Sequence, residues 1–147
     1  MTTDFVPQDP EYETRVRASF ARQRVMETIG ARLLRVAPGE VEIGLAFRAD
    51  LTQQHGYLHA GIVAAVVDSA CGYAALSLAP VGVEVLSIEF KLNLLSPAAG
   101  ESFVARARVL RAGRRVTVCA GDLFALRDGG AEKLVATMLA TMMTVGA

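Results

Sequence analysis

Residues 61–78 form one long apolar segment, which constrains the fold of this chain more than any other stretch. The segment is rich in alanine, which favours a helix, and Pro80 follows as a stop. Apolar residues occur on every side of this helix, so we expect it to be buried all round. Its one charged side chain is Asp68. Burying a carboxylate is unfavourable without partners and raises its pKa. Asp68 is therefore either a functional residue or a structural acceptor of hydrogen bonds.

A membrane-spanning helix is a further interpretation, because about 20 apolar residues can cross a bilayer. Residues 61–83 are long enough for this. However, a carboxylate near the middle costs roughly 2.5–3.5 kcal/mol on insertion scales. No Lys or Arg closely flanks the segment either. We therefore expect a helix of a protein core and no membrane partner.

The composition is that of one globular domain over residues 1–147, with residues 1–29 as an N-terminal extension and helix. The 15 Lys and Arg balance the 15 Asp and Glu, so no net charge favours nucleic acid. Cys71 and Cys119 are too few for a disulfide framework and fit small core positions in a reducing compartment. The first residues lack an apolar signal segment, so we expect a cytoplasmic protein.

The remaining chain predicts one helix before the apolar segment and strands on both sides of it. The helix is expected at residues 10–28, and the strands at residues 31–37, 41–47, 86–95, 102–111, 114–126 and 133–145. In the strand at 86–95 every second residue is large and apolar, which places Ser87 on the opposite face. The last four strands are expected to form a meander. An antiparallel sheet wrapped around the apolar helix accommodates every segment.

A homo-oligomer follows from this arrangement. A single curled sheet covers only part of a helix that is apolar all round, and it leaves long strand edges unpaired. Both features predict a dimer, or a dimer of dimers, in which another subunit covers the rest.

Three features resemble the hotdog-fold acyl-CoA thioesterases of the phenylacetate-pathway (PaaI-type) branch. They are the tripeptide His59-Ala60-Gly61 at the start of the helix, Asp68 about two turns into it, and the Ser96-Pro97 turn. The resemblance implies an α+β hotdog fold, an antiparallel sheet around a long central helix, with an extra N-terminal helix. It also implies hydrolysis of an acyl-CoA or aryl-acyl-CoA to the free acid and coenzyme A. No cofactor is implied beyond the coenzyme A of the substrate.

The chemistry of thioester hydrolysis suits these residues. Asp68 can act as general base or as nucleophile, because burial raises its pKa and its basicity. Backbone N–H groups of Ala60 and Gly61, at a helix N-terminus, can hold the developing oxyanion. Asp68 lies about 10 Å along the helix from Gly61, at 1.5 Å per residue. In the resembling family the acid meets the helix N-terminus of the neighbouring subunit, which implies a site shared across a dimer.

Three further residues are weaker candidates. Gln53, where relatives often carry Asn, either orients the water or thioester or is a solvated loop residue. His59 either takes part in catalysis or holds the loop by hydrogen bonds. Ser87 matches a position that assists the acid in some relatives. Ala60 replaces the usual middle glycine of the tripeptide.

Arg111, Arg114 and Arg115 at a hairpin tip are candidates for binding the coenzyme A phosphates, with a solvated basic turn as the alternative. Metal binding is not expected, because His55 and His59 lack supporting ligands.

Two other functions fit the same pattern. A hydratase or dehydratase acting on acyl thioesters pairs a histidine before the helix with an acid inside it, as His55 and Asp68 roughly do. A non-catalytic acyl-binding protein would keep the fold and lose turnover, and the departures at Ala60 and Gln53 are compatible with it.

Overall fold

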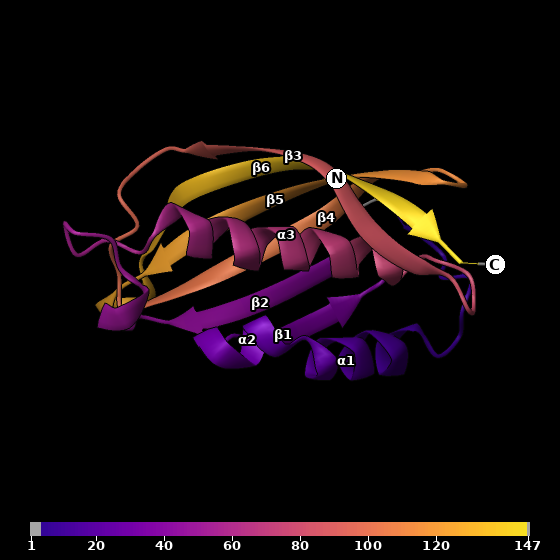
Figure 1. Cartoon of the computed structure of the whole chain (residues 1–147), viewed down its shortest axis with the longest axis horizontal. Helices are drawn as coiled ribbons and strands as arrows, with labels where there is room; N and C mark the ends of the chain where they lie inside the picture. Colours follow the sequence, from indigo (N-terminus) through magenta and orange to yellow (C-terminus); the bar gives the residue numbers. More distant parts are fainter. Residues whose placement is uncertain (1–3, 147) are drawn as a thin grey trace.

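The computed structural model describes residues 4–146, which form one sheet wrapped around a central helix (Figure 1). Two helices precede the sheet, α1 (Tyr12–Arg22) and α2 (Arg24–Ile29), and the central helix is α3 (Ala60–Leu76). The strands are β1 (Arg32–Ala37), β2 (Glu40–Ala46), β3 (Glu84–Leu94), β4 (Ser102–Ala112), β5 (Val116–Leu126) and β6 (Glu132–Val145). Two short 3₁₀ turns, η1 (Ala49–Leu51) and η2 (Asp128–Gly130), lie in the connections.

The sheet has the order β1-β2-β4-β5-β6-β3, and every neighbouring pair is antiparallel. Together with α3 it forms the expected α+β hotdog fold, with α1 and α2 as the extra N-terminal helices. The expected meander of four strands is wrong for β3, which pairs with β6 instead of β4. Hairpins join β4, β5 and β6, whereas residues 95–101 between β3 and β4 form a longer connection that crosses to the other side of β6.

The N-terminal helix is broken where a single helix was expected. Gln23 has an extended backbone, with φ −80° and ψ 97°, and separates α1 from α2. Gly30 ends α2 in the left-handed conformation, φ 76°, which glycine adopts readily because it has no Cβ.

Arg15 fastens α1 to the far end of α3. Its guanidinium forms a 3.1 Å ion pair with Asp9 and donates hydrogen bonds to three carbonyl oxygens at that end, those of Leu76, Ala79 and Pro80. Carbonyls at a helix C-terminus have no partner within the helix and favour a cation. Arg15 therefore caps the central helix and positions the N-terminal helices beside it.

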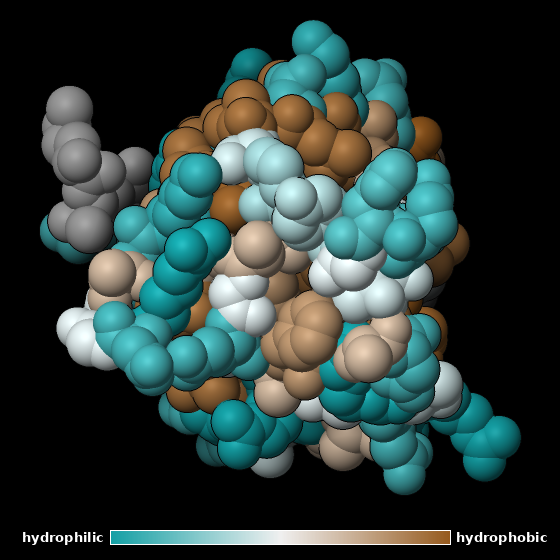
Figure 2. Space-filling view, turned by 90° about the vertical axis from the view of Figure 1, so that its left-hand side faces the viewer, coloured by the Kyte–Doolittle hydropathy of each residue, from teal (hydrophilic) through white to brown (hydrophobic). Residues whose placement is uncertain are grey.

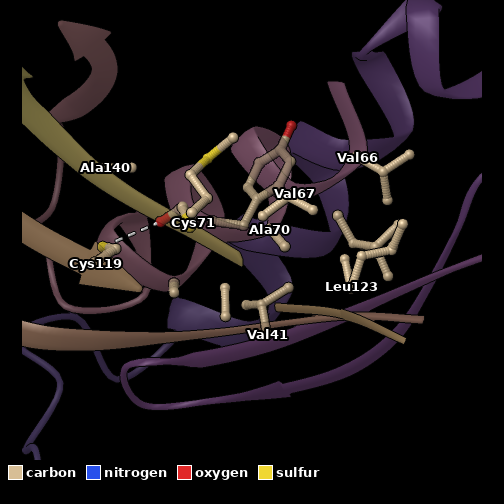
Figure 3. Packing of buried hydrophobic residues seen from close by; sticks show 14 of the residues in the cluster. Val41, Val66, Val67, Ala70, Cys71, Cys119, Leu123 and Ala140 are labelled. Carbon is tan, nitrogen blue, oxygen red and sulfur yellow. Dashed lines mark hydrogen bonds between the residues drawn. The ribbon is translucent and has the colours of Figure 1, made fainter. Parts of the chain in front are cut away.

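The core lies between α3 and the concave face of the sheet (Figure 3). Val66, Val67 and Ala70 of the helix are fully buried, as are Val41 and Leu123 of the strands. Cys71 and Cys119 are both free and buried, and the Cys119 thiol lies 3.5 Å from the Cys71 carbonyl. Burial raises the pKa of both thiols, that of Cys119 to about 12. The prediction that both cysteines fill core positions is confirmed.

The helix approaches β5 very closely at Gly121. A Cβ atom there would lie 2.7 Å from Val67 Cγ1 and 2.9 Å from Cys71 Sγ. Only glycine lets α3 pack at this depth against the middle of the sheet, so Gly121 helps to set the position of the helix.

Part of α3 and one edge of the sheet have no cover from the described residues. Ala65, Asp68 and Gly72 are only half-buried, and they share one face of the helix. At the edge, β3 exposes Leu86 and Ile88, with 58% and 55% of their surface accessible. Among residues 4–146 no helix is long and apolar enough to span a membrane.

Replacing Gly121 with alanine is expected to destabilise the protein by about 1–3 kcal/mol, the usual cost of overpacking a core. The new methyl group meets packed side chains of α3. Gly44→Ala is the matched control, because its Cβ would meet only the flexible, half-exposed side chain of Leu34. Denaturant unfolding of both variants checks this. Equal losses of stability would contradict the close packing at Gly121.

Candidate active site

Asp68 lies on α3 with its carboxylate beside the start of β3. Its Oδ1 accepts a hydrogen bond of 2.7 Å from the Ser87 hydroxyl. Desolvation raises the pKa of Asp68 above its usual range, and the bond from Ser87 partly offsets this by stabilising the ionised form. The carboxylate is thus both more basic than an ordinary Asp and held in one orientation.

A β-bulge in β3 brings Ser87 to this position. The register with β6 shifts between Ser87 and Glu89, so Ile88 is an extra residue without a partner. Ser87 pairs with the buried Met142 and directs its hydroxyl toward α3 while remaining exposed, whereas Leu86 pairs with the half-exposed Met143 on the outer face. Strict alternation predicts Ser87 on the face opposite the large apolar residues of β3. It does lie opposite Leu86, but the bulge places it on the same inner face as Phe90 and Leu92.

Met142 packs beneath the hydroxyl, with its Sδ 3.2 Å from Ser87 Oγ. A serine hydroxyl has one proton to donate, and a carboxylate is a much stronger acceptor than a thioether. The proton is therefore directed at Asp68.

The start of α3 holds the tripeptide. His59 is the N-cap, and its Nδ1 accepts a 2.8 Å hydrogen bond from the Gly61 N–H. The imidazole thus has its acceptor nitrogen directed into the helix, and its Nε2 carries the proton in the neutral form. Ala60 is the first helical residue, and its N–H has no hydrogen-bond partner among residues 4–146. No non-glycine residue in that range has a positive φ, so alanine at position 60 fits without strain.

Gln53 shapes the loop before the helix. Its Oε1 accepts hydrogen bonds from the backbone N–H groups of His55, at 2.5 Å, and Tyr57, at 3.4 Å. The side-chain oxygen is therefore used within the loop, which leaves the amide NH₂ as the group that can donate to a ligand.

Two cavities flank these groups at different points along α3. The first, of about 370 Å³, lies at the helix start; its lining includes Gln53, Tyr57, Ala60, Leu94 and Pro97. Figure 2 views this end of the molecule, where apolar surface in brown and tan lies between hydrophilic groups. The second, the Asp68 cleft, has a volume of about 220 Å³ and lies between α1, α3 and β3; its lining includes Ser19, Gln23, Asp68, Tyr73 and Ser87.

Within one subunit, the structure therefore separates the candidates into two groups. Asp68 and Ser87 lie together at one cavity. Gln53, Ala60 and the flanking His59 and Gly61 lie together at the other.

The three candidate arginines lie elsewhere. Arg111, Arg114 and Arg115 are exposed at the β4–β5 hairpin. Arg114 lines a separate cavity of about 330 Å³ with Leu78 and Pro80, beyond the C-terminal end of α3. In one subunit they are thus at the opposite end of the helix from Ala60.

His55 is exposed in the loop before α3, and the hydrogen bond to Asp68 comes from Ser87. Residues 4–146 contain no group of three or more His, Cys, Asp or Glu side chains placed to hold a metal ion.

Comparison with known proteins decides the family. The profile of the thioesterase superfamily matches residues 55–132, just over half of the chain. The chain belongs to the thioesterase superfamily. The matched residues include the tripeptide, Asp68 and Ser87, whereas Gln53 lies just before them.

Solved structures support this membership. A thioesterase family protein from Silicibacter pomeroyi is 52% identical, with a TM-score of 0.90, over 92% of this chain and 99% of the other. A phenylacetic acid degradation-related protein from Ralstonia eutropha is 26% identical, with a TM-score of 0.76, over 90% and 98% of the two chains. The PaaI protein of the E. coli phenylacetic acid degradation operon is 18% identical and shares the fold, with a TM-score of 0.83, over 95% and 97%. The resemblance to the PaaI-type hotdog thioesterases is confirmed.

Sequence patterns did not indicate that Ser19, Gln23 and Tyr73 line the Asp68 cleft of this thioesterase-superfamily chain. Nothing in the helical pattern of residues 10–28 marks the break at Gln23, which places the Gln23 amide at the cleft. Tyr73 lies five residues after Asp68, so the helical spacing of three or four that marks neighbouring side chains does not link the two.

Replacing Ser87 with alanine is expected to raise the pKa of Asp68 further, because the hydroxyl stabilises the ionised carboxylate. The folded protein already holds this proton more tightly than the unfolded chain. Its stability therefore falls as pH rises from the usual Asp range through the raised pKa, and the variant extends that fall to higher pH. NMR titration of the Asp68 carboxyl carbon measures the shift directly.

Ser19→Ala is the matched control, since Ser19 lines the same cleft and bonds Tyr73 instead of Asp68. A carboxyl titration unchanged or lowered by Ser87→Ala would contradict the assigned hydrogen bond.

Proposed function

We propose that this protein is an acyl-CoA thioesterase that releases a free acid and coenzyme A. The observation that carries the proposal is the Asp68 carboxylate, oriented by Ser87 at the mouth of a cleft and kept basic by partial burial. Membership of the thioesterase superfamily supports the reaction class.

In the proposed reaction, Asp68 takes a proton from a water molecule as the water oxygen attacks the thioester carbon. The C–S bond then breaks, the proton returns to the coenzyme A sulfur, and the acid is released. Direct attack by the carboxylate is the other route: an anhydride forms with Asp68, coenzyme A leaves, and water hydrolyses the anhydride. Both routes need the same carboxylate in its ionised form.

The oxyanion is proposed to bind at the start of α3. The unpartnered Ala60 N–H supplies the donor, and the helix dipole adds to it. His59 holds the Gly61 N–H, so its role in this proposal is to fix the first turn. The NH₂ of Gln53, at the same cavity, supplies a second donor to the thioester.

A dimer is proposed because one subunit keeps these two groups apart. The edge strand β3 is 11 residues long and exposes apolar side chains along its length. Pairing with β3 of a second copy would bury them and extend the sheet. A two-fold axis at this edge runs the two α3 helices in opposite directions, which brings Ala60 of one copy toward Asp68 of the other. A dimer of dimers remains the larger assembly we predict.

The same arrangement carries the β4–β5 hairpin of one copy toward the end at which α3 of the other begins. Arg111, Arg114 and Arg115 are therefore proposed to bind the phosphates of coenzyme A across the dimer, as charged groups at the surface.

Asp68→Asn tests the function. It keeps the shape of the side chain and removes the base, so kcat is expected to fall by about 10²-fold or more. Stability at neutral pH should stay equal or rise, because the variant no longer desolvates a charge. Release of free thiol from a panel of acyl- and aryl-acyl-CoA esters gives kcat, and thermal unfolding of the same preparation gives stability.

The panel also separates the alternatives, since hydration of enoyl-CoA esters is followed in parallel. Hydration without thiol release would indicate a hydratase, and binding without either would indicate an acyl-binding protein. An Asp68→Asn protein that unfolds at lower temperature and keeps normal turnover would show that the carboxylate is structural.

A further inference from the structure

The wall of the Asp68 cleft that α1 contributes is polar, and the reaction proposed above makes no use of it. Ser19 and Gln23 form this wall, and they face Ser69 and Tyr73 of α3. Glu84 of β3 adds a carboxylate to the same cleft. A cavity that takes a plain alkyl chain would be lined mostly by apolar groups.

Gln23 has hydrogen-bonding capacity that the protein leaves unused. Its Nε2 donates a 3.1 Å hydrogen bond to Ser69 Oγ, whereas its Oε1 is buried and has no partner among the described residues. Buried polar atoms almost always have a partner, and an exception calls for one from outside the chain. The extended backbone at Gln23, between α1 and α2, is what places this amide at the cleft.

Tyr73 is the second under-used group. Its hydroxyl is 3.4 Å from Ser19 Oγ, longer than the 2.5–3.0 Å usual for O–H···O bonds. Phe20 packs edge-on against its ring, with centroids 5.8 Å apart, which fixes the ring in place. Desolvation raises the pKa of Tyr73, so the hydroxyl stays neutral and available.

We propose that the Asp68 cleft receives the acyl part of the substrate and that Gln23 selects short acyl groups carrying a hydroxyl or another hydrogen-bond donor. The inference rests on the proposed thioesterase function. At about 220 Å³ the cleft is smaller than the roughly 300–1,000 Å³ of drug-sized sites, which suits a short group. A substrate donor would satisfy Gln23 Oε1 after a small rotation of the amide, while an alkyl group would leave these polar groups unpaired.

Two matched esters test the proposal, butanoyl-CoA and β-hydroxybutanoyl-CoA. The unmodified protein should show a kcat/KM about fivefold or more higher for the hydroxylated ester, as one added hydrogen bond allows. Gln23→Leu should bring the ratio to unity or below. Gln8→Leu is the matched control and should keep the ratio, since Gln8 bonds the Leu78 carbonyl at the far end of α3. A ratio taken on one preparation does not depend on the fraction of folded protein.

Calorimetric Kd values for the two esters on the Asp68→Asn protein, with and without Gln23→Leu, give a readout without turnover. A difference in Kd between the two esters that is lost with Gln23→Leu supports the selection. If the unmodified protein hydrolyses neither ester, that result contradicts only the proposed thioesterase function. Equal kcat/KM or Kd values for the two esters in the protein with Gln23, or a ratio that Gln23→Leu leaves unchanged, would overturn the proposal.

Discussion

Asp68 is the only charged side chain of α3, and the surrounding fold limits how that charge can be held. The helix is buried against the sheet along Val63, Val67 and Ala70, so the carboxylate occupies the one face that the sheet does not cover. Even there, desolvation raises its pKa, and the Ser87 hydroxyl is the one group that offsets the effect. The hydrogen bond between these two residues ties the central helix to the edge strand at the point where we propose the chemistry takes place.

This bond depends on three other features of the fold. Gly121 lets α3 lie deep against β5, which sets the height of the helix above the sheet. The bulge at Ile88 turns Ser87 toward the helix and turns Leu86 outward, onto an edge that one subunit leaves open. Arg15 ties α1 to the end of α3, so the N-terminal helices form the remaining wall of the Asp68 cleft. The proposed site and the proposed dimer interface thus arise from the same strand.

Sequence patterns predicted the parts of this structure that follow from regular periodicity. The apolar segment, its single carboxylate and the alternation along the strands lead to a buried helix inside an antiparallel sheet, and the tripeptide before Asp68 resembles one thioesterase branch. Irregular features were not predictable in this way. A bulge adds one residue without changing the apolar pattern, so the pattern did not show that Ser87 shares the inner face with Phe90 and Leu92. The break at Gln23 has no signal in the sequence, because glutamine is itself a good helix former. The pairing of β3 with β6 depends on the path of the connection between β3 and β4, which no local pattern encodes.

The two halves of the proposed site lie apart within one subunit, so a second subunit has to complete the site. Mixed dimers test this most directly. Ala60→Pro removes the unpartnered N–H at the first helical position, where proline is tolerated. His59 before it already has an extended backbone, with φ −61° and ψ 138°, as a residue preceding proline requires. Dimers of Ala60→Pro alone and of Asp68→Asn alone should both be nearly inactive. Unfolding and refolding the two variants together should restore roughly a quarter of the normal activity, because half of the two-fold dimers then contain one intact shared site. No recovery in mixtures that demonstrably contain heterodimers would contradict a site shared between subunits.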